Sequence, residues 1–267
     1  MKEIDIAGRK SIQMSIMDAV DEFCQEHDIR YSLACGSLLG AIRHGGYIPW
    51  DDDIDIYMLR EDYTRFAKAF PKVYKGRYEF GALERDEHWT FLLGKVWDNR
   101  TKMVDTRQHT TDIGINIDIF PIDDVPEDNA TFERWNKWRK QQLIHLRRSS
   151  LHFSQDFALW QNVLVPFVRL RYLFFNRKRA LHRLNKAIQR FNGQNSAMVF
   201  ETSSGLFVKH SFPKRLFDDI TDIKFEDRTY KAFALYDEYL TLTFGDYMTP
   251  PPPEKQVPHH FERSYWK

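Results

Sequence analysis

The chain has 267 residues, of which 42% are hydrophobic and 29% are charged, a balance that excludes a disordered protein and a lone small module. Its formal net charge is only +1, so net charge indicates no polyanionic partner, and we expect no nucleic-acid binding. Two cysteines, Cys24 and Cys35, do not have the spacing of a secreted disulfide scaffold, and we therefore expect a cytoplasmic protein with reduced thiols.

The first part of the chain alternates between helix-like and strand-like apolar spacing. This alternation is typical of a β-sheet that packs against helices, and we expect residues 1–128 to form an α/β core. Pro121 should end the last strand, because proline lacks the N–H that a central strand donates. In chain order we expect a helix at 8–27, a strand at 31–34, a short helix at 38–42, a strand at 54–58, a helix at 60–70, and strands at 91–97 and 114–120.

A basic region with helical spacing follows at residues 129–195. Residues 134–190 contain 14 lysines or arginines and a single acidic residue, Asp156. Such a surface favours contact with an anionic glycan or with lipid headgroups. We therefore expect a basic helical insertion that makes peripheral contact with the inner face of a membrane.

One stretch of this region, residues 157–175, is strongly apolar but does not read as a membrane span. Pro166, Arg169 and Arg171 interrupt it below the roughly 18 to 20 apolar residues that a span needs. Pro166 should also break the helix.

The last part of the chain, residues 196–267, is expected to return to the core. It contains a predicted helix at 230–244 and a proline-rich run that favours an extended, polyproline-like path. His259 and His260 lie near its end, and whether either enters the site is left open.

Three acidic residues alternate at the start of the strand predicted at 54–58. On a strand, Asp51, Asp53 and Asp55 would share one face while Ile54 and Ile56 point into the core. Alternate residues lie about 6.5 to 7 Å apart, so two such carboxylates can converge on one divalent ion, which also relieves their mutual repulsion. Oxygen-only ligation suits Mg²⁺ or Mn²⁺ better than Zn²⁺. The alternative is a solvated acidic turn.

Asp118 is the natural third carboxylate. It lies between Ile117 and Ile119 on another predicted strand, where an acid without a partner would be costly to bury. Asp118 would complete the metal site or accept the proton of an attacking hydroxyl. The alternative is a structural role, in which Asp118 acts as a cap or pairs with an arginine.

A phosphate-binding element is predicted just upstream. Gly36 and Ser37 lie in a turn that leads into a short helix, where backbone amides and a hydroxyl can hold a phosphate. Arg43, His44 and Lys95 are candidates to neutralise the remaining phosphate charge. The alternatives are a helix N-cap at Ser37 and an ordinary surface pair at Arg43 and His44.

The run GSLLGAIRHGGYIPWDDDIDI at residues 36–56 closely resembles the LicD family, which includes bacterial phosphocholine transferases and the fukutin-related enzymes. The later run IDIFPIDDVP at residues 117–126 and the tail motifs YDEYL and FGDYM are similar to the same family. The first motif is long and therefore specific, and the matches touch both ends of the chain.

The resemblance implies a nucleotidyltransferase-like fold, so we expect an α+β protein with a mixed β-sheet core, flanking helices and the basic helical insertion. It places the active site at Gly36 and Ser37, with Asp53 and Asp55 as an Asp-x-Asp pair and Asp118 as the third acid. Asp53, Asp55 and Asp118 are thus the expected catalytic residues and the expected ligands of Mg²⁺ or Mn²⁺.

The resemblance also implies a reaction. A CDP-activated donor, CDP-choline or a similar CDP-alcohol, would give its alcohol phosphate to a sugar hydroxyl of a cell-surface glycan, such as lipopolysaccharide, teichoic acid or capsule, that could be lipid-linked. Two rivals stay open: a nucleotidyltransferase that attaches a nucleoside monophosphate to a protein or sugar, and a noncatalytic binder of anionic glycans or membrane surfaces.

Overall fold

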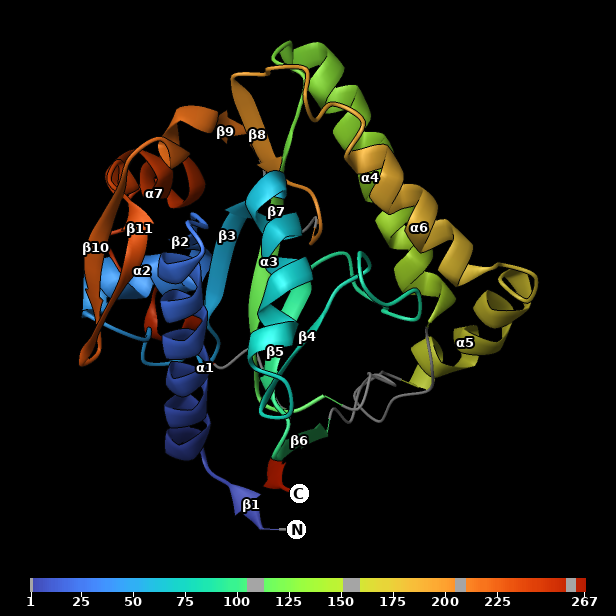
Figure 1. Cartoon of the computed structure of the whole chain (residues 1–267). Helices are drawn as coiled ribbons and strands as arrows, with labels where there is room; N and C mark the ends of the chain where they lie inside the picture. The colour runs from blue at the N-terminus through green and yellow to red at the C-terminus, as the bar shows by residue number, and fades with distance from the viewer. Residues whose placement is uncertain (1, 105–112, 151–158, 205–209, 258–262) are drawn as a thin grey trace.

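The computed structural model of the chain describes residues 2–104, 113–150, 159–204, 210–257 and 263–267 (Figure 1). The helices are α1 (Ile6–Glu26), α2 (Cys35–His44), α3 (Arg60–Val73), α4 (Asn129–Ser149), α5 (Leu159–Arg171), α6 (Arg177–Ile188), α7 (Tyr236–Phe244), and the short 3₁₀ turns η1 (Lys214–Phe217) and η2 (Pro253–Lys255). The strands are β1 (Glu3–Ile4), β2 (Ser32–Leu33), β3 (Asp55–Leu59), β4 (Tyr78–Gly81), β5 (Gly94–Asp98), β6 (Thr101–Val104), β7 (Asn116–Asp124), β8 (Met198–Glu201), β9 (Phe212–Pro213), β10 (Ile220–Phe225), β11 (Arg228–Phe233) and β12 (Arg263–Trp266).

A mixed, seven-stranded sheet forms the centre of the molecule (Figure 1). Its strands lie in the order β2, β3, β7, β5, β4, while β8 also pairs with β7 and β9 pairs with β8. β3 and β7 are parallel, and the other described pairs of this sheet are antiparallel. The helices and the mixed sheet confirm the expected α+β class.

The two faces of the sheet differ where β3 and β7 run side by side. Ile56 lies in register with Ile119, and both side chains are fully buried. α3 covers this face. Gly94 on β5 lies in register with Ile119, and a Cβ on Gly94 would lie 2.9 Å from the hydroxyl of Tyr63, which belongs to α3. Because side chains alternate along a strand, the neighbouring Asp55 and Asp118 point to the opposite face.

β7 continues beyond Pro121, so the expectation that Pro121 ends this strand is wrong. β5 pairs with β7 only as far as Ile119, and β8 begins to pair at Ile122. The N–H of Asp118 donates to Ile54 on the β3 side, so alternation puts the nitrogen of Pro121 on the side of β5 and β8. Pro121 therefore lies in the gap between these two partners, where its missing N–H costs no ladder hydrogen bond.

The expected helix at 230–244 is wrong in its first part. Residues 228–233 form β11, which pairs with β10 in a hairpin, and the helix begins only at Tyr236. Tyr230 and Ala232, at positions i and i+2, are both buried, and this period of two is the spacing of a strand. Glu226, with φ of 56°, provides the turn that joins the two strands.

Two other expectations about helices are also wrong in detail. Pro166 lies inside α5 instead of breaking it. Proline removes one backbone hydrogen bond, and the helix continues on both sides of Pro166. α2 begins at Cys35, so Gly36 and Ser37 belong to its first turn rather than to a preceding loop.

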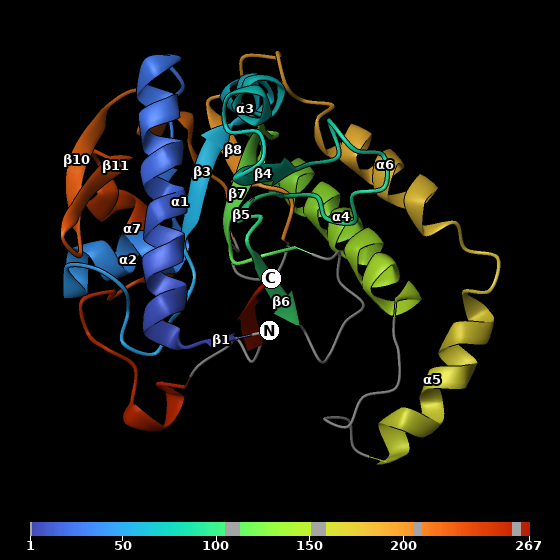
Figure 2. The ribbon, with the colours of Figure 1, turned by 60° about the horizontal axis from the view of Figure 1, so that its bottom comes forward.

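The basic region forms three helices beside the sheet (Figures 1 and 2). α4 and α6 pack together through a buried apolar cluster that contains Phe132, Trp135, Leu181 and Leu184. α5 lies at the outer edge of the molecule in both views. No helix in the described ranges is both long and apolar enough to cross a membrane. The limits 1–128, 129–195 and 196–267 remain predictions.

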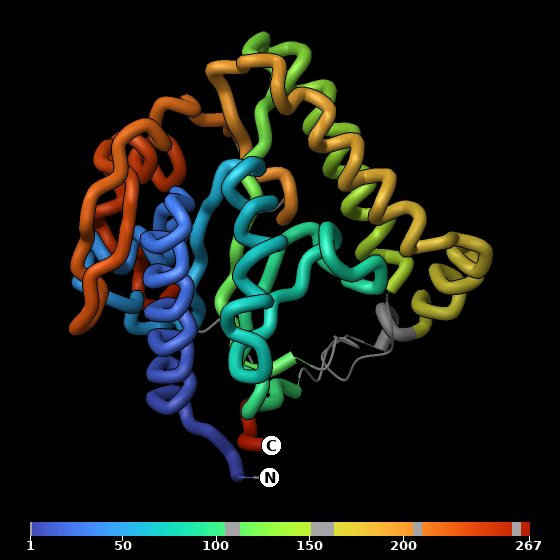
Figure 3. The backbone as a smooth tube through the Cα atoms, viewed as in Figure 1, coloured from blue at the N-terminus to red at the C-terminus, as the bar shows by residue number. Residues whose placement is uncertain are grey.

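The two ends of the chain lie close together (Figure 3). β12 pairs on one side with β1 and on the other with β6, forming a small antiparallel sheet. The N–H of Trp266 donates to the carbonyl of Lys2 at 2.9 Å. The last residues of the tail are therefore held against the beginning of the chain.

Candidate active site

Asp55 and Asp118 are neighbours across the parallel pair of strands. β3 and β7 place Asp55 in register with Asp118. β3 begins at Asp55, so the expectation that Asp51 and Asp53 continue the strand is wrong, and both lie in the irregular segment before it. The N–H of Asp118 donates to the carbonyl of Ile54 at 2.9 Å, which holds this segment against β7.

The carboxylates are close enough to affect one another. The pKa of Asp55 lies well above its usual value of 3.8, firstly because of burial and then because of the charges of Asp53, Asp118 and Asp51. Lys95 opposes this rise. The charges of Asp53, Asp118 and Asp51 thus all act on Asp55, and the sequence had indicated each of these acids.

Lys95 is the cation next to Asp118. On β5 it lies in register with Asp118, and its ammonium group forms an ion pair with the Asp118 carboxylate. The same nitrogen donates to Oδ1 of Asn116 at 3.2 Å and lies 5.6 Å from the centre of the Phe91 ring. Asp118 is therefore paired with a lysine, not with the arginine of the alternative reading.

Ser37 ties the first turn of α2 to β3. Its hydroxyl accepts a hydrogen bond from the N–H of Asp55 at 2.8 Å, and its side chain is buried. The N-cap of α2 is Ala34, so the alternative that Ser37 caps the helix is wrong. Ser37 instead fixes the backbone of Asp55 beside the helix N-terminus.

Gly36 permits a close approach that a larger residue would block. A Cβ at this position would lie 2.6 Å from Oδ2 of Asp51. The carboxylate of Asp51 therefore reaches the first turn of α2, where the positive end of the helix dipole favours a negative charge. The N–H of Cys35 donates to the hydroxyl of Tyr239 at 3.4 Å, whereas the amides of Gly36 and Ser37 have no acceptor within the helix and can bind an anion.

Cys35, directly before Gly36, has an unusual backbone. Its φ of 47° lies in the left-handed region that non-glycine residues seldom adopt. Its Sγ lies 3.1 Å from the hydroxyl of Tyr57. Burial, and then the charge of Asp55, raise the pKa of the Cys35 thiol, so the side chain stays protonated and unreactive.

Arg43 and His44 lie at the other end of α2 and have no described contact with the acids. Arg43 donates to the carbonyl of Tyr247 at 2.8 Å and to Nε2 of His44 at 2.9 Å. The ring of His44 lies edge-on to Trp50 at 6.1 Å, and Trp50 directly precedes Asp51. A role of Arg43 and His44 in phosphate binding stays a prediction, and His259 and His260 lie outside the described residues.

The oxygen donors of Asp53, Asp55 and Asp118 fit the chemistry of Mg²⁺ or Mn²⁺. After burial, the charges of Asp53 and Asp118 contribute to the raised pKa of Asp55, and a cation would relieve their repulsion. In the described ranges, however, no three histidine, cysteine or acidic side chains are arranged as a ready metal site. The ammonium group of Lys95 neutralises Asp118 in this conformation.

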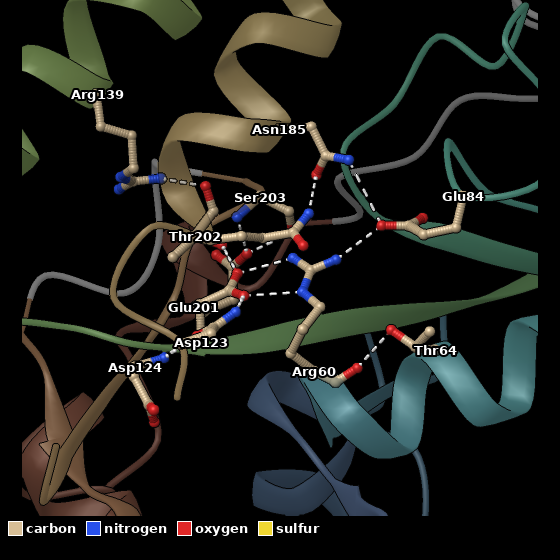
Figure 4. A network of polar contacts seen from close by, with 12 residues as sticks. Arg60, Thr64, Glu84, Asp123, Asp124, Arg139, Asn185, Glu201, Thr202 and Ser203 are labelled. Atoms are coloured by element: carbon tan, nitrogen blue, oxygen red, sulfur yellow. Dashed lines mark hydrogen bonds and ion pairs between the residues drawn. The ribbon is translucent and has the colours of Figure 1, made fainter. Parts of the chain in front are cut away.

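A second polar network, which the sequence did not indicate, lies at the far end of β7 (Figure 4). Arg60 at the start of α3 donates to both carboxylate oxygens of Asp123 at 2.7 and 2.8 Å, and to Glu84 at 2.9 Å. Asp123 also accepts from Asn192 and from Thr202, each at 2.6 Å. Asp123 lies five residues after Asp118 on the same strand, so its side chain points to the opposite face, which α3 covers. Asp123 therefore belongs to the packing of the core.

The sequence analysis also missed a second buried acid, Glu201. Glu201 at the end of β8 lies in register with Ile122 and therefore on the same face as Asp118. It accepts hydrogen bonds from the N–H groups of Ser203 and Ser204 at 2.6 and 2.9 Å, and from both hydroxyl groups. The only sequence signal was the run of hydroxyl residues that follows Glu201.

The chain is similar in sequence to known proteins. A sequence model described as LicD/FKTN/FKRP, nucleotidyltransferase domain, matches residues 28–152. The lipopolysaccharide cholinephosphotransferase LicD of Haemophilus influenzae is 29% identical over 273 residues, which covers 99% of each chain. Residues 28–152 therefore contain a domain of the LicD family. The ribitol 5-phosphate transferases FKRP of Homo sapiens and Mus musculus are each 59% identical over 34 residues, 13% of this chain and 7% of theirs.

The LicD-family match confirms the resemblance that the sequence motifs indicated. It contains all of the residues predicted for the site, namely Gly36, Ser37, Arg43, His44, Asp53, Asp55, Lys95 and Asp118.

Proposed function

We propose that this LicD-type transferase moves phosphocholine, or a related alcohol phosphate, from a CDP-activated donor to a sugar hydroxyl of a cell-surface glycan. The relative that matches along its whole length is named as a lipopolysaccharide cholinephosphotransferase, which supports this substrate class. The single observation that carries the catalytic part is the register of Asp55 with Asp118, beside Asp53 and the first turn of α2.

The carboxylates of Asp53, Asp55 and Asp118 would hold Mg²⁺ or Mn²⁺, which would supply positive charge for the diphosphate of the donor. The amides of Gly36 and Ser37 in the first turn of α2 would bind a phosphate oxygen. Lys95 would add positive charge from the neighbouring strand. Most of the acceleration would come from this positioning and charge neutralisation.

The reaction itself is a displacement at phosphorus. The acceptor hydroxyl loses its proton to one of the three carboxylates, and its oxygen forms a bond to the phosphorus that carries choline. The bond from this phosphorus to the bridging oxygen breaks, and CMP leaves with the electron pair. The products are a phosphocholine-substituted sugar and CMP.

The test is CMP release by the purified protein with Mg²⁺ and a panel of CDP-activated alcohols. We expect CDP-choline or a close relative to be turned over, and Asp53→Asn, Asp55→Asn and Asp118→Asn each to lose about three orders of magnitude in rate. Asp124→Asn is the matched control, since Asp124 lies on β7 but pairs with Lys214 at 2.8 Å, away from the acids. Substantial turnover by any of the three site variants would overturn its assignment.

A nucleotidyltransferase is the second candidate, because the matched family model is described as a nucleotidyltransferase domain. Mass spectrometry of the modified acceptor separates the two, since phosphocholine and a nucleoside monophosphate add different masses. A noncatalytic binder would release no CMP with any donor.

A further inference from the structure

α5 has an apolar face that points away from the protein. Val163, Phe167 and Leu170 follow one another at helical spacing and are 64%, 68% and 70% exposed. Leu173 and Phe174, just after the helix, are 66% and 96% exposed. Single exposed apolar residues are ordinary, but a contiguous row of large ones marks a surface that another partner covers.

The opposite side of α5 is the one that packs on the protein. Val165 is only 3% exposed, and the hydroxyl of Tyr172 lies 2.6 Å from Nδ1 of His145 on α4. The ring of Phe175 packs against Tyr172 and against the buried cluster between α4 and α6. These contacts fix the orientation of α5, so its outward apolar face is a feature of the fold.

The charge around this face is positive. Arg169 and Arg171 on α5 are exposed, as are Arg147 and Arg148 at the end of α4 and Arg179 near the start of α6. Neither α5 nor α6 contains an acidic residue. Arginines thus border the apolar row, and α5 and α6 carry no acidic residue that would neutralise them.

We propose that α5 and the turn after it, Val163 to Phe174, form a docking surface for an anionic lipid bilayer. The apolar side chains enter the boundary between headgroups and acyl chains, while the arginines contact the phosphate groups. α5 lies at the outer edge of the molecule (Figures 1 and 2), and the side chains of its apolar row are exposed. This inference is independent of the proposed reaction.

The positive charge around the apolar row favours a lipid bilayer over a second copy of the chain as the partner. In a two-fold dimer the same patch meets itself, so the arginines of one copy would face those of the other. Like charges in such an interface repel, whereas an anionic membrane surface attracts them. The observations therefore favour lipid.

The experiment is flotation of the full-length protein with vesicles of phosphatidylcholine alone or mixed with phosphatidylglycerol. We expect binding to the anionic vesicles, about tenfold weaker binding to the neutral ones, and weakening by salt. The double variant Phe167→Ser/Leu170→Ser should bind the anionic vesicles about tenfold less tightly than the native protein, because it loses inserted apolar area.

The matched control is Val73→Ser/Leu242→Ser, which removes apolar residues of 55% and 45% exposure on α3 and α7. This variant should bind vesicles as the native protein does. Thermal unfolding verifies that each variant is folded, and CMP release from a water-soluble donor should be unchanged in both, which separates this test from that of the reaction. Equal binding by the native protein and the α5 variant, or no binding by the native protein, would overturn the proposal. So would sedimentation showing a dimer that the α5 variant abolishes.

Discussion

The hydroxyl of Ser37 makes a different interaction from the one that the sequence analysis predicted. The sequence analysis predicted that this hydroxyl binds a phosphate. In the structure its oxygen accepts a hydrogen bond from the N–H of Asp55. A hydroxyl group can accept and donate at the same time, so its proton remains available to a phosphate oxygen. Ser37 therefore positions a carboxylate beside the helix N-terminus and is still able to take part in binding.

Asp55 gives the site a pH dependence that can be measured without substrate. Burial and the neighbouring acids raise its pKa in the folded protein above the usual 3.8 of the unfolded chain. In the window between these two values the folded state holds a proton that the unfolded state has released, so the contribution of Asp55 to stability falls as pH rises.

We expect the free energy of unfolding of the metal-free native protein to fall more than that of Asp55→Asn between about pH 4 and about pH 8. Urea unfolding in the presence of a chelator measures both curves, and Asp124→Asn is the control. Parallel curves for the native protein and Asp55→Asn would show that the carboxylates do not interact as described.

At the scale of elements, Arg60 and Asp123 join α3 to β7. Arg60→Met would leave the Asp123 carboxylate buried, with Asn192 and Thr202 as its remaining partners among the described residues. Removing one member of a buried ion pair costs about 3 to 5 kcal/mol, which is the loss of unfolding free energy that we expect.

Urea unfolding tests this. Arg215→Met, at an exposed pair with Glu238, is the control with an expected loss of at most about 1 kcal/mol. A loss of less than about 1 kcal/mol in Arg60→Met would mean that the network contributes little.

The sequence predicted the elements with strong periodicity and a clear chemical pattern. The helix α1, the strand β3 and the group formed by Asp53, Asp55 and Asp118 follow from apolar spacing and from the cost of unpaired acids. Their relative positions followed only from the structure, because the pairing of β3 with β7 is a long-range contact.

Other features have no local signal. The apolar residues of β11 also fit a helical spacing, so only its pairing with β10 decides the conformation. Strands as short as β1 and β12 contain no usable period. The partner of Arg60 is set by tertiary packing, since Asp123 is far away in sequence.

At the scale of the whole molecule, the acids and the basic helices belong to different parts of the structure. The acids lie on the face of the sheet opposite α3, whereas the apolar row of α5 lies at the outer edge. An enzyme that modifies a glycan attached to lipid would benefit from such an arrangement, because one surface can hold the membrane while the other performs the reaction.

The central claim is that Asp53, Asp55 and Asp118 together bind one divalent cation. Binding of Mn²⁺ to the purified protein, followed by electron paramagnetic resonance, tests it most directly. We predict that the native protein and the Asp124→Asn control each bind one Mn²⁺ ion per chain, and that Mg²⁺ displaces this ion. Asp53→Asn, Asp55→Asn and Asp118→Asn should each bind Mn²⁺ at least about tenfold more weakly. Native-like Mn²⁺ binding by all three variants would contradict the account.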